Sequence, residues 1–466
     1  MSRILLIATN RATSPYVVYP LGMAVVAGAL TAAGHEIEQF DLLATETEPP
    51  KIKQAKNEQT GTKAPNPHNP LTAIIKNFAP EFIGLSLRNI DNTDSFSGVA
   101  GWYLEAARQT VKEIRTLTAV PLIVGGPAFS LMPEAILDYL QADYGIIGEG
   151  EEALPRLIKQ LNAGKTPPAL HKGIRPLNGD EFASPRFHAE ILDFYQSRSG
   201  MANLQSKRGC PHRCAYCTYP ELEGRRFRHR PPAAVVDDLE RLKKDHKIEK
   251  FFFVDSVFND DEGHHLAIAE EILKRALKLQ WSAFFRPRSL GLKELKLMQQ
   301  AGLLALELGS DALTAKTLAG LSKGFTFDDI CTTHENCLKL KLPTAHYLIF
   351  GGPDETPATL AEGLSHLDRL AGSVLFLFSG LRLLPGTRLY QRALQEKVIT
   401  ATTSLLRPTY YFSPEIDPES MNREIAQACR GHRERLFPPA EALERLKIMQ
   451  RFGFKGLLWD QLLKHS

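Results

Sequence analysis

Short apolar runs alternate with helical patterns along the first third of the chain, and this alternation constrains the fold more than any other feature. Buried parallel strands are short continuous apolar stretches, and consecutive parallel strands need a crossover helix between them. The sequence therefore predicts a doubly wound α/β domain whose ligand lies beyond the carboxyl ends of the strands. The expected strands are Ile4–Ala8, His35–Leu42, Phe82–Ser86, Pro121–Val124 and Asp143–Ile147, with helical patterns at Leu21–Ala33, Trp102–Thr116 and Pro133–Leu140.

Three of these strands lead into unusual residues at their carboxyl ends. Glycine there would let the backbone approach a ligand closely, and loops at this edge of a sheet commonly carry function. The P-loop and the GxGxxG fingerprint are both absent. The candidate binding residues at these ends are Ser86, Arg88, Asn89, Gly125, Gly126, Gly148 and Glu149.

Three of the six cysteines stand together as Cys210, Cys214 and Cys217, with the spacing Cys-x₃-Cys-x₂-Cys. Three thiolates can hold three irons of a cubane cluster and leave the fourth iron open for reaction chemistry. The alternative is a zinc site completed by a distant histidine or cysteine. That spacing is uncommon for structural zinc, and no neighbouring Cys-x₂-Cys pair is present.

The cysteine motif, with the aromatic Tyr216 before its third cysteine, resembles the signature of radical S-adenosylmethionine (SAM) enzymes. The resemblance implies a [4Fe–4S] cluster whose open iron is chelated by SAM, which is then cleaved to methionine and a 5′-deoxyadenosyl radical. It also implies a partial (β/α)₆ TIM-like barrel, with reactive groups at the carboxyl ends of the strands. The expected barrel strands are Asn203–Ser206, Phe251–Val254, Ser282–Phe285, Ala305–Leu308, His346–Phe350 and Val374–Phe378.

The same resemblance assigns SAM contacts to the strand ends. Asp255, after the second strand, would meet the methionyl end of SAM, and Glu307 or Ser310 would meet the ribose. Gly351 and Gly352 look like the end of the glycine-containing adenine strand. Tyr216 and Arg286 complete the set of expected cofactor-binding residues in the barrel.

The N-terminal strand ends, together with Pro20-Leu21-Gly22, resemble the cobalamin-binding domain that precedes many radical SAM domains. One departure concerns the loop after the first strand. Cobalamin domains of the methionine-synthase type carry Asp-x-His-x-x-Gly there, whereas the segment from Asn10 to Pro15 has no histidine. The resemblance therefore implies a cobalamin whose lower face lacks a histidine ligand from this loop.

These features predict a Rossmann-like cobalamin-binding domain over 1–166, a linker over 167–200, a radical SAM barrel over 201–395 and a small, mostly helical C-terminal extension over 396–466 on the substrate side. The function implied is a cobalamin-dependent radical SAM methyltransferase that acts on an unactivated carbon through a 5′-deoxyadenosyl radical and methylcobalamin. One alternative is a rearrangement, cyclisation or ring contraction with the same cofactors. Another is a non-enzymatic cobalamin-binding protein with structural zinc. No cysteine precedes Cys210, which argues against an RNA methylthiotransferase with a second cluster.

Composition limits the classes of binding partner and the cellular compartment that we expect for the protein. The net charge is only +3, from 56 basic and 53 acidic residues, so electrostatics gives no case for a nucleic acid or an anionic membrane. No apolar run of the sequence is long enough to span a bilayer. Few cysteines, half of them clustered, fit a reducing cytoplasm. The resemblance implies a small-molecule, lipid or peptide substrate and a low-potential electron donor such as flavodoxin or ferredoxin.

Two other groups are expected to have ordinary roles. The basic stretch from Arg225 to Arg230 could suggest nucleic-acid binding, but local pairing or contacts on the SAM side fit the low net charge better. Cys331, His334 and Cys337 could suggest a metal site. The two cysteines are six residues apart and so lie off one helical face, which favours simple packing.

Overall fold

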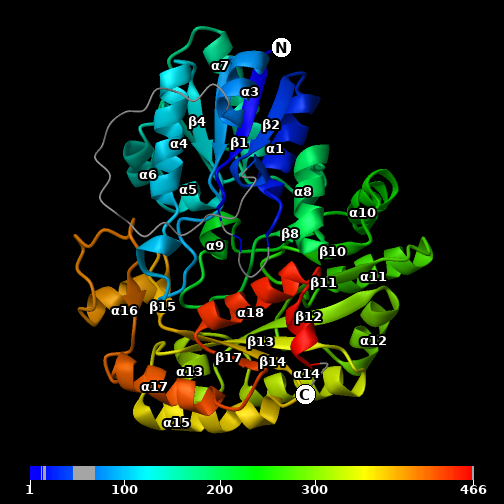
Figure 1. Ribbon diagram of the computed structural model, residues 1–466, viewed down its shortest axis with the longest axis vertical. Helices are drawn as coiled ribbons and strands as arrows, with labels where there is room; N and C mark the ends of the chain where they lie inside the picture. The colour runs from blue at the N-terminus through cyan, green and yellow to red at the C-terminus, as the bar shows by residue number, and fades with distance from the viewer. Residues whose placement is uncertain (12, 14–16, 46–68, 464–466) are drawn as a thin grey trace.

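The computed structural model of the protein describes residues 1–11, 13, 17–45 and 69–463. The chain forms two α/β domains, one above the other in Figure 1, with the C-terminal helix α18 across the middle of the lower one in this view. None of the helices described is both long and apolar enough to cross a membrane.

The upper domain is a six-stranded sheet in the order β2-β1-β3-β4-β5-β6, and every neighbouring pair is parallel. The order changes direction between β1 and β3, which makes that place the topological switch point of a doubly wound sheet. The strands are β1 (Arg3–Ala8), β2 (Glu36–Asp41), β3 (Phe82–Ser86), β4 (Leu122–Gly125), β5 (Tyr144–Ile147) and β6 (Leu170–Lys172).

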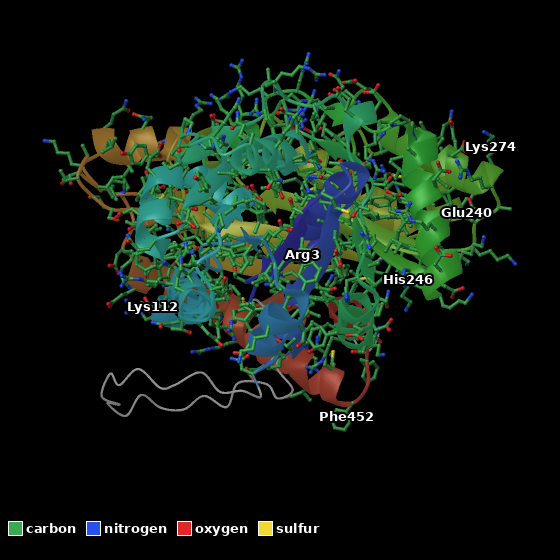
Figure 2. All side chains as sticks on the ribbon, turned by 90° about the horizontal axis from the view of Figure 1, so that it is seen from above. Arg3, Lys112, Glu240, His246, Lys274 and Phe452 are labelled. Carbon is green, nitrogen blue, oxygen red and sulfur yellow. The ribbon has the colours of Figure 1, made fainter. Side chains whose placement is uncertain are left out.

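Helices cover both faces of this sheet, because its central strands are apolar on both sides. Leu6 of β1 packs in one core with Met23 and Leu157, whereas its neighbours Leu5 and Ile7 pack in another. The helices are α1 (Leu21–Ala32), α2 (Leu42–Thr45), α3 (Pro70–Phe78), α4 (Leu104–Leu117), α5 (Pro127–Leu131), α6 (Pro133–Leu140) and α7 (Gly150–Asn162). Figure 2 shows charged side chains such as Lys112 on the outer side of these helices.

The segment 167–200, expected to be a linker, has more structure than its pattern indicates. It supplies β6, the edge strand of the first sheet, and a helix, α8 (Ala189–Ser199). Tyr195 of α8 is buried and donates a hydrogen bond of 3.0 Å to Asp41 at the end of β2. An edge strand of three residues with the sequence Leu-His-Lys has no apolar run to reveal it, so periodicity could not find β6.

The lower domain contains a seven-stranded parallel sheet in the order β17-β14-β13-β12-β11-β10-β7. Six strands are the expected barrel series, and the sheet is an open barrel whose edges are β7 and β17. β17 (Arg435–Leu436) was not expected, because two residues carry no strand pattern. The other strands are β7 (Ala202–Leu204), β10 (Lys250–Phe253), β11 (Gln280–Phe285), β12 (Leu303–Asp311), β13 (Thr344–Phe350) and β14 (Val374–Ser379).

Helices pack on the outer face of this barrel, where Leu306 and Leu308 of β12 join the same core as Met298 of α12. Glu240 and His246 on α10 and Lys274 on α11 lie at the periphery in Figure 2. The helices are α10 (Pro232–His246), α11 (His264–Lys274), α12 (Leu292–Gln300), α13 (Ala315–Gly320), α14 (Phe327–Lys339), α15 (Pro357–Ser365) and α16 (Arg388–Gln395).

The C-terminal extension completes the inside of the barrel. It contains α17 (Pro418–Cys429), α18 (Pro439–Arg451) and a 3₁₀ turn, η4 (Trp459–Leu463). Trp459 is 1% exposed and packs with Phe252 and Phe376 of the inner strand faces. Its indole N–H donates to Glu307 Oε1 at 3.1 Å. The tail therefore contributes a side chain that fills the barrel interior beside Glu307.

Candidate active site

The cysteine loop connects β8 (Lys207–Arg208) to α9 (Tyr219–Leu222), and β8 pairs with β9 (Arg228–His229). Gly209 precedes the first cysteine with φ +88°, and a Cβ there would lie 1.9 Å from the Arg226 carbonyl oxygen. Only glycine fits such a position. The amide of Cys210 donates to the Gly224 carbonyl at 3.0 Å, and the amide of Ala215 donates to the Leu321 carbonyl at 2.9 Å. These bonds anchor the loop at its first cysteine and just after its second.

A buried polar group holds the middle of the loop. The Tyr216 hydroxyl donates to the carboxylate of Asp311, at the end of β12, and the Lys323 ammonium reaches the same carboxylate at 2.5 Å. Burial works to lower the pKa of Lys323, but Asp311 and Cys214 outweigh it and hold that pKa above its usual value. Asp311, the last residue of β12, and Lys323, in the segment between α13 and α14, were not predicted from the sequence, because no motif or spacing marks them.

The three cysteines lie in one loop but are spread more widely than the ligands of one ion. Sulfurs around a tetrahedral zinc are about 3.8 Å apart, given Zn–S bonds of about 2.3 Å. Over the described part of the chain, the one group of three ligand atoms within 4.8 Å of one another does not include these cysteines. Burial raises the pKa of the Cys210 thiol, and it raises the pKa of Cys217 to about 12. Binding of a cluster must therefore release thiol protons.

Two of the expected SAM contacts lie beside the loop and are engaged with backbone groups. The Asp255 carboxylate accepts from the Ser206 amide at 2.7 Å and from the Lys207 amide at 3.2 Å, immediately before the cysteines. Arg286 donates to the Lys323 and Gly324 carbonyls. Burial lowers the pKa of Arg286, and the thiols of Cys214 and Cys210 partly oppose that change. Asp255 therefore fixes the backbone just before the cysteine loop, and Arg286 lies near the thiols of that loop.

Glu307 and Ser310, the two alternatives for the ribose, face opposite sides of β12. Glu307 points into the barrel, where the Tyr347 hydroxyl donates to it at 2.8 Å. Ser310 is 2.8 Å from His346 Nδ1 on the outer side, and the other ring nitrogen of His346 is 3.4 Å from His334. Side chains alternate between the two faces of a strand, so these two residues could not both face the barrel interior.

Gly351 and Gly352 follow β13 under the C-terminal tail. Gly351 has φ +81°, and a Cβ would meet Met421 and Phe412 at 3.0 Å. Both its conformation and the space around it therefore require glycine. Gly352 packs against Leu321, the residue whose carbonyl accepts the cysteine-loop amide. The glycine pair therefore lies next to the cysteine loop. Met421 and Phe412, from the C-terminal tail, cover Gly351.

A cavity of about 850 Å³ separates the two domains at the carboxyl edge of the first sheet. Its size is at the upper end of the range of about 300–1,000 Å³ for small-molecule sites. No histidine is found among the described residues that line it. All seven residues predicted from the strand ends line it, namely Ser86, Arg88, Asn89, Gly125, Gly126, Gly148 and Glu149.

Glycines keep this cavity open on the upper side. A Cβ at Gly22 or at Gly148 would have no atom within 4 Å and would project into open space. The lower side comes from the barrel domain: Phe284 of β11, Tyr219 of α9 and Thr218. Thr218 directly follows Cys217, so the cavity extends to the cysteine loop.

Charged side chains join the two domains along one wall of the cavity. Glu149 forms ion pairs with Arg208 at 3.1 Å and with Arg228 at 2.8 Å, and Arg208 also pairs with Glu151 at 2.6 Å. The guanidinium of Arg208 lies 4.2 Å from the centre of the Phe182 ring. Sequence analysis singled out Glu149 but missed Arg208 as its partner.

The basic stretch is paired locally, as expected. In the basic stretch, Arg225 pairs with Glu221, Arg228 with Glu149 and Arg230 with Asp238. Cys331, His334 and Cys337 are buried on α14, and they form no group of converging metal ligands within the described residues.

Comparison with known families matches both domains. Residues 7–158 match the B12 binding domain, and residues 204–367 match the radical SAM superfamily. The chain is therefore a radical SAM protein with an N-terminal B12-binding domain, which confirms the predicted family and fold class. These domains imply a [4Fe–4S] cluster, SAM and cobalamin as cofactors, as expected.

Individual proteins of known sequence or structure are similar to this chain. The chain is 25% identical to a tryptophan 2-C-methyltransferase of Streptomyces laurentii over 66% of this chain and 63% of that protein, so it spans slightly less than two thirds of that relative. It is 23% identical to an uncharacterized methyltransferase, PH0819, of Pyrococcus horikoshii over 71% of this chain and 72% of that protein. The structure of TsrM from Kitasatospora setae, a radical SAM methyltransferase with cobalamin and a [4Fe–4S] cluster bound, has the same fold. Its TM-score is 0.83 at 22% identity, over 100% of this chain and 98% of that one.

Proposed function

We propose that the protein is a cobalamin-dependent radical SAM methyltransferase that transfers a methyl group to an unactivated carbon. One observation carries the proposal: the cavity at the carboxyl edge of the B12-binding sheet is also lined by Thr218 and Tyr219, next to Cys217. A corrin in this cavity would therefore face the cluster loop. The Streptomyces and Pyrococcus relatives described above are both named methyltransferases.

The chain's own residues have distinct roles in this proposal. When bound, the cofactors supply methyl-carrier and radical chemistry, and the protein binds, orients and shields them. The seven residues lining the upper side hold cobalamin, with Gly22 and Gly148 leaving room for it. Cys210, Cys214 and Cys217 hold the cluster, and Tyr216 positions their loop through Asp311.

SAM lies between these two sites in the proposal. Arg286, Gly351 and Gly352 are next to the cysteine loop and are the proposed SAM contacts, while Asp255 positions the loop. Glu307 faces the barrel interior, on the substrate side, whereas Ser310 faces outward toward His346 and acts through packing. We further propose a small-molecule, lipid or peptide substrate, a low-potential donor such as flavodoxin or ferredoxin, and a cytoplasmic location.

The test uses protein reconstituted anaerobically with iron, sulfide and cobalamin, then given reductant and SAM with a deuterated methyl group. Mass spectrometry should find the deuterated methyl on protein-bound cobalamin and then in a product formed from a pool of candidate small molecules. Cys214→Ala should abolish formation of 5′-deoxyadenosine. Turnover of SAM to 5′-deoxyadenosine without label in cobalamin or product would favour a rearrangement or cyclisation instead.

A further inference from the structure

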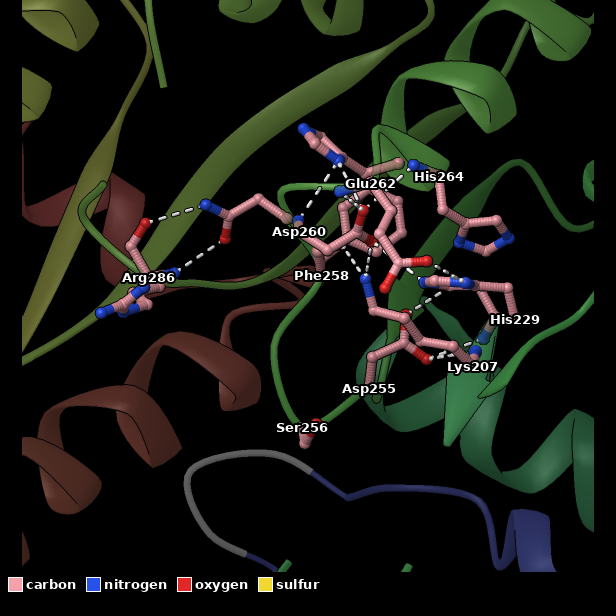
Figure 3. Close-up of polar contacts among 12 residues, drawn as sticks. Lys207, His229, Asp255, Ser256, Phe258, Asp260, Glu262, His264 and Arg286 are labelled. Carbon is pink, nitrogen blue, oxygen red and sulfur yellow. Dashed lines mark hydrogen bonds and ion pairs between the residues drawn. The ribbon is translucent and has the colours of Figure 1, made fainter. Parts of the chain in front are cut away.

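A second set of metal-ligating side chains lies beside the cluster loop and does not involve the cysteines. His229 ends β9, Asp260 lies in the loop after β10, and His264 is the first residue of α11. One ligand atom from each lies within 4.8 Å of the other two, a property that no other set of three among the described residues shares. Figure 3 shows the three side chains gathered around Lys207.

The hydrogen bond of His264 fixes which of its ring nitrogens carries a proton. Its Nε2 is 2.8 Å from the Arg230 carbonyl oxygen. That oxygen can only accept, so Nε2 carries the hydrogen and Nδ1 keeps its lone pair. The residue is 7% exposed, and no described group forms a hydrogen bond with Nδ1. Its ring centre lies 4.4 Å from that of His229. A buried, unsatisfied acceptor next to a second imidazole calls for a ligand.

The ring of His229 lies between two carboxylates. Its Nδ1 faces Glu262 Oε2 at 3.6 Å, and its Nε2 faces Asp260 Oδ2 at 3.5 Å. Among the described residues, Nε2 has no hydrogen-bond partner. Histidines that bind metals usually donate the other ring N–H to a carboxylate or a carbonyl, which fixes the ring. The Arg230 carbonyl has that position for His264, whereas Glu262 Oε2 lies too far from His229 Nδ1 for a hydrogen bond.

Asp260 completes the set and is itself oriented. Its Oδ1 accepts the amides of Glu262 and His264, both at 3.1 Å, while its Oδ2 accepts the ammonium of Lys207. Lys207 is fully buried and also donates to the Phe258 carbonyl at 2.6 Å. Mg²⁺ and Ca²⁺ prefer oxygen ligands, so a site with two imidazoles does not suit them. Two imidazoles and one carboxylate are instead ligands that suit zinc.

We propose that His229, Asp260 and His264 form a zinc site with three protein ligands, in which Lys207 orients Asp260 and the Arg230 carbonyl orients His264. The site links β9 to the loop after β10. Since β9 pairs with β8, which leads directly into Cys210, a zinc ion here would fix the base of the cluster loop. The inference goes beyond the proposed function and does not depend on it.

The direct test is diffraction from crystals of the cluster-loaded protein soaked in zinc chloride, with data recorded on both sides of the zinc absorption edge. We expect one anomalous peak bounded by His229, Asp260 and His264, separate from the iron signal at the cysteines. Absence of a peak there, or zinc found only at the cysteines, overturns the proposal. In that case Lys207 and the two backbone amides satisfy Asp260 without a metal.

Zinc content in solution gives an independent test. The cluster-loaded protein should retain one zinc per chain against a chromophoric chelator, and His264→Gln and His229→Gln should each lose it while still binding cobalamin. His265→Gln is the matched control, because His265 Nδ1 already accepts the Asp260 amide at 3.3 Å, and it should keep its zinc. Zinc retained in both the His229 and His264 variants, or lost only in the His265 variant, contradicts the assignment.

Discussion

Replacing Asp311 by asparagine should destabilise the barrel domain far more than an isosteric change usually does. The carboxylate is buried between Lys323 and Tyr216, and its side chain is 5% exposed against 8% for the lysine. The residue has a φ of +61°, in the left-handed region that asparagine tolerates as well as aspartate does. The substitution leaves a buried ammonium without its counter-charge, which costs about 3–5 kcal/mol. For a domain of about 150–250 residues, this corresponds to a Tm lower by about 6–20 °C.

Asp354→Asn is the matched control for that experiment. Asp354 also has a positive φ, +64°, and pairs with an arginine, Arg392, at 2.6 Å, but both side chains are about one-third exposed. Exposed pairs contribute about 0–1 kcal/mol, so the Tm should fall by no more than about 4 °C. Calorimetry of cluster-free protein measures both, and Asp311→Asn combined with Lys323→Met should recover most of the loss. Equal shifts for Asp311→Asn and Asp354→Asn would refute the reasoning.

Three further predictions follow from other parts of the molecule. Gly22→Leu should leave the Tm within about 2 °C of the wild type. It should lower the cobalamin bound per chain, measured by absorbance after gel filtration, because the new side chain enters the open cavity. Trp459→Phe removes the indole donor to buried Glu307 and should cost about 1–3 kcal/mol in urea unfolding. Burial raises the pKa of Asp41 from 3.8 to about 6, so the folded state binds the proton more tightly than the unfolded one. Its contribution to stability is therefore greatest below about pH 4 and is lost as the pH rises to about 6, by up to about 3 kcal/mol. Denaturation of Asp41→Asn should lack this slope, and an unchanged pH profile would contradict the assignment.

The sequence predicted the parts of the fold that are long and apolar. Strands such as β1, β3 and β10 were found because they are almost entirely buried and so form continuous apolar runs. β6 and β17 were missed because strands of three and two residues are too short to show a periodic sequence pattern. Backbone hydrogen bonds to neighbouring strands nevertheless place them in the sheets.

Backbone topology determines which strand-end residues lie together. The carboxyl ends of parallel strands lie at one edge, so Ser86, Gly125 and Gly148 were expected to line one cavity, and they do. Long-range side-chain partners were not predictable. Nothing near Tyr216 indicates that Asp311 and Lys323 will hold it, and nothing near Glu307 indicates that Trp459 will return from the tail to contact it. Such pairs join segments far apart in the sequence, and only the tertiary fold reveals them.

The most direct test of the central claim is one crystal of the anaerobically reconstituted protein, with anomalous data collected at the iron and cobalt edges. The account predicts an iron cluster held by the sulfurs of Cys210, Cys214 and Cys217 alone, with cobalt in the cavity between the two domains and facing that cluster. A single ion at the cysteines with a fourth protein ligand, or cobalt absent from the cavity, would contradict it.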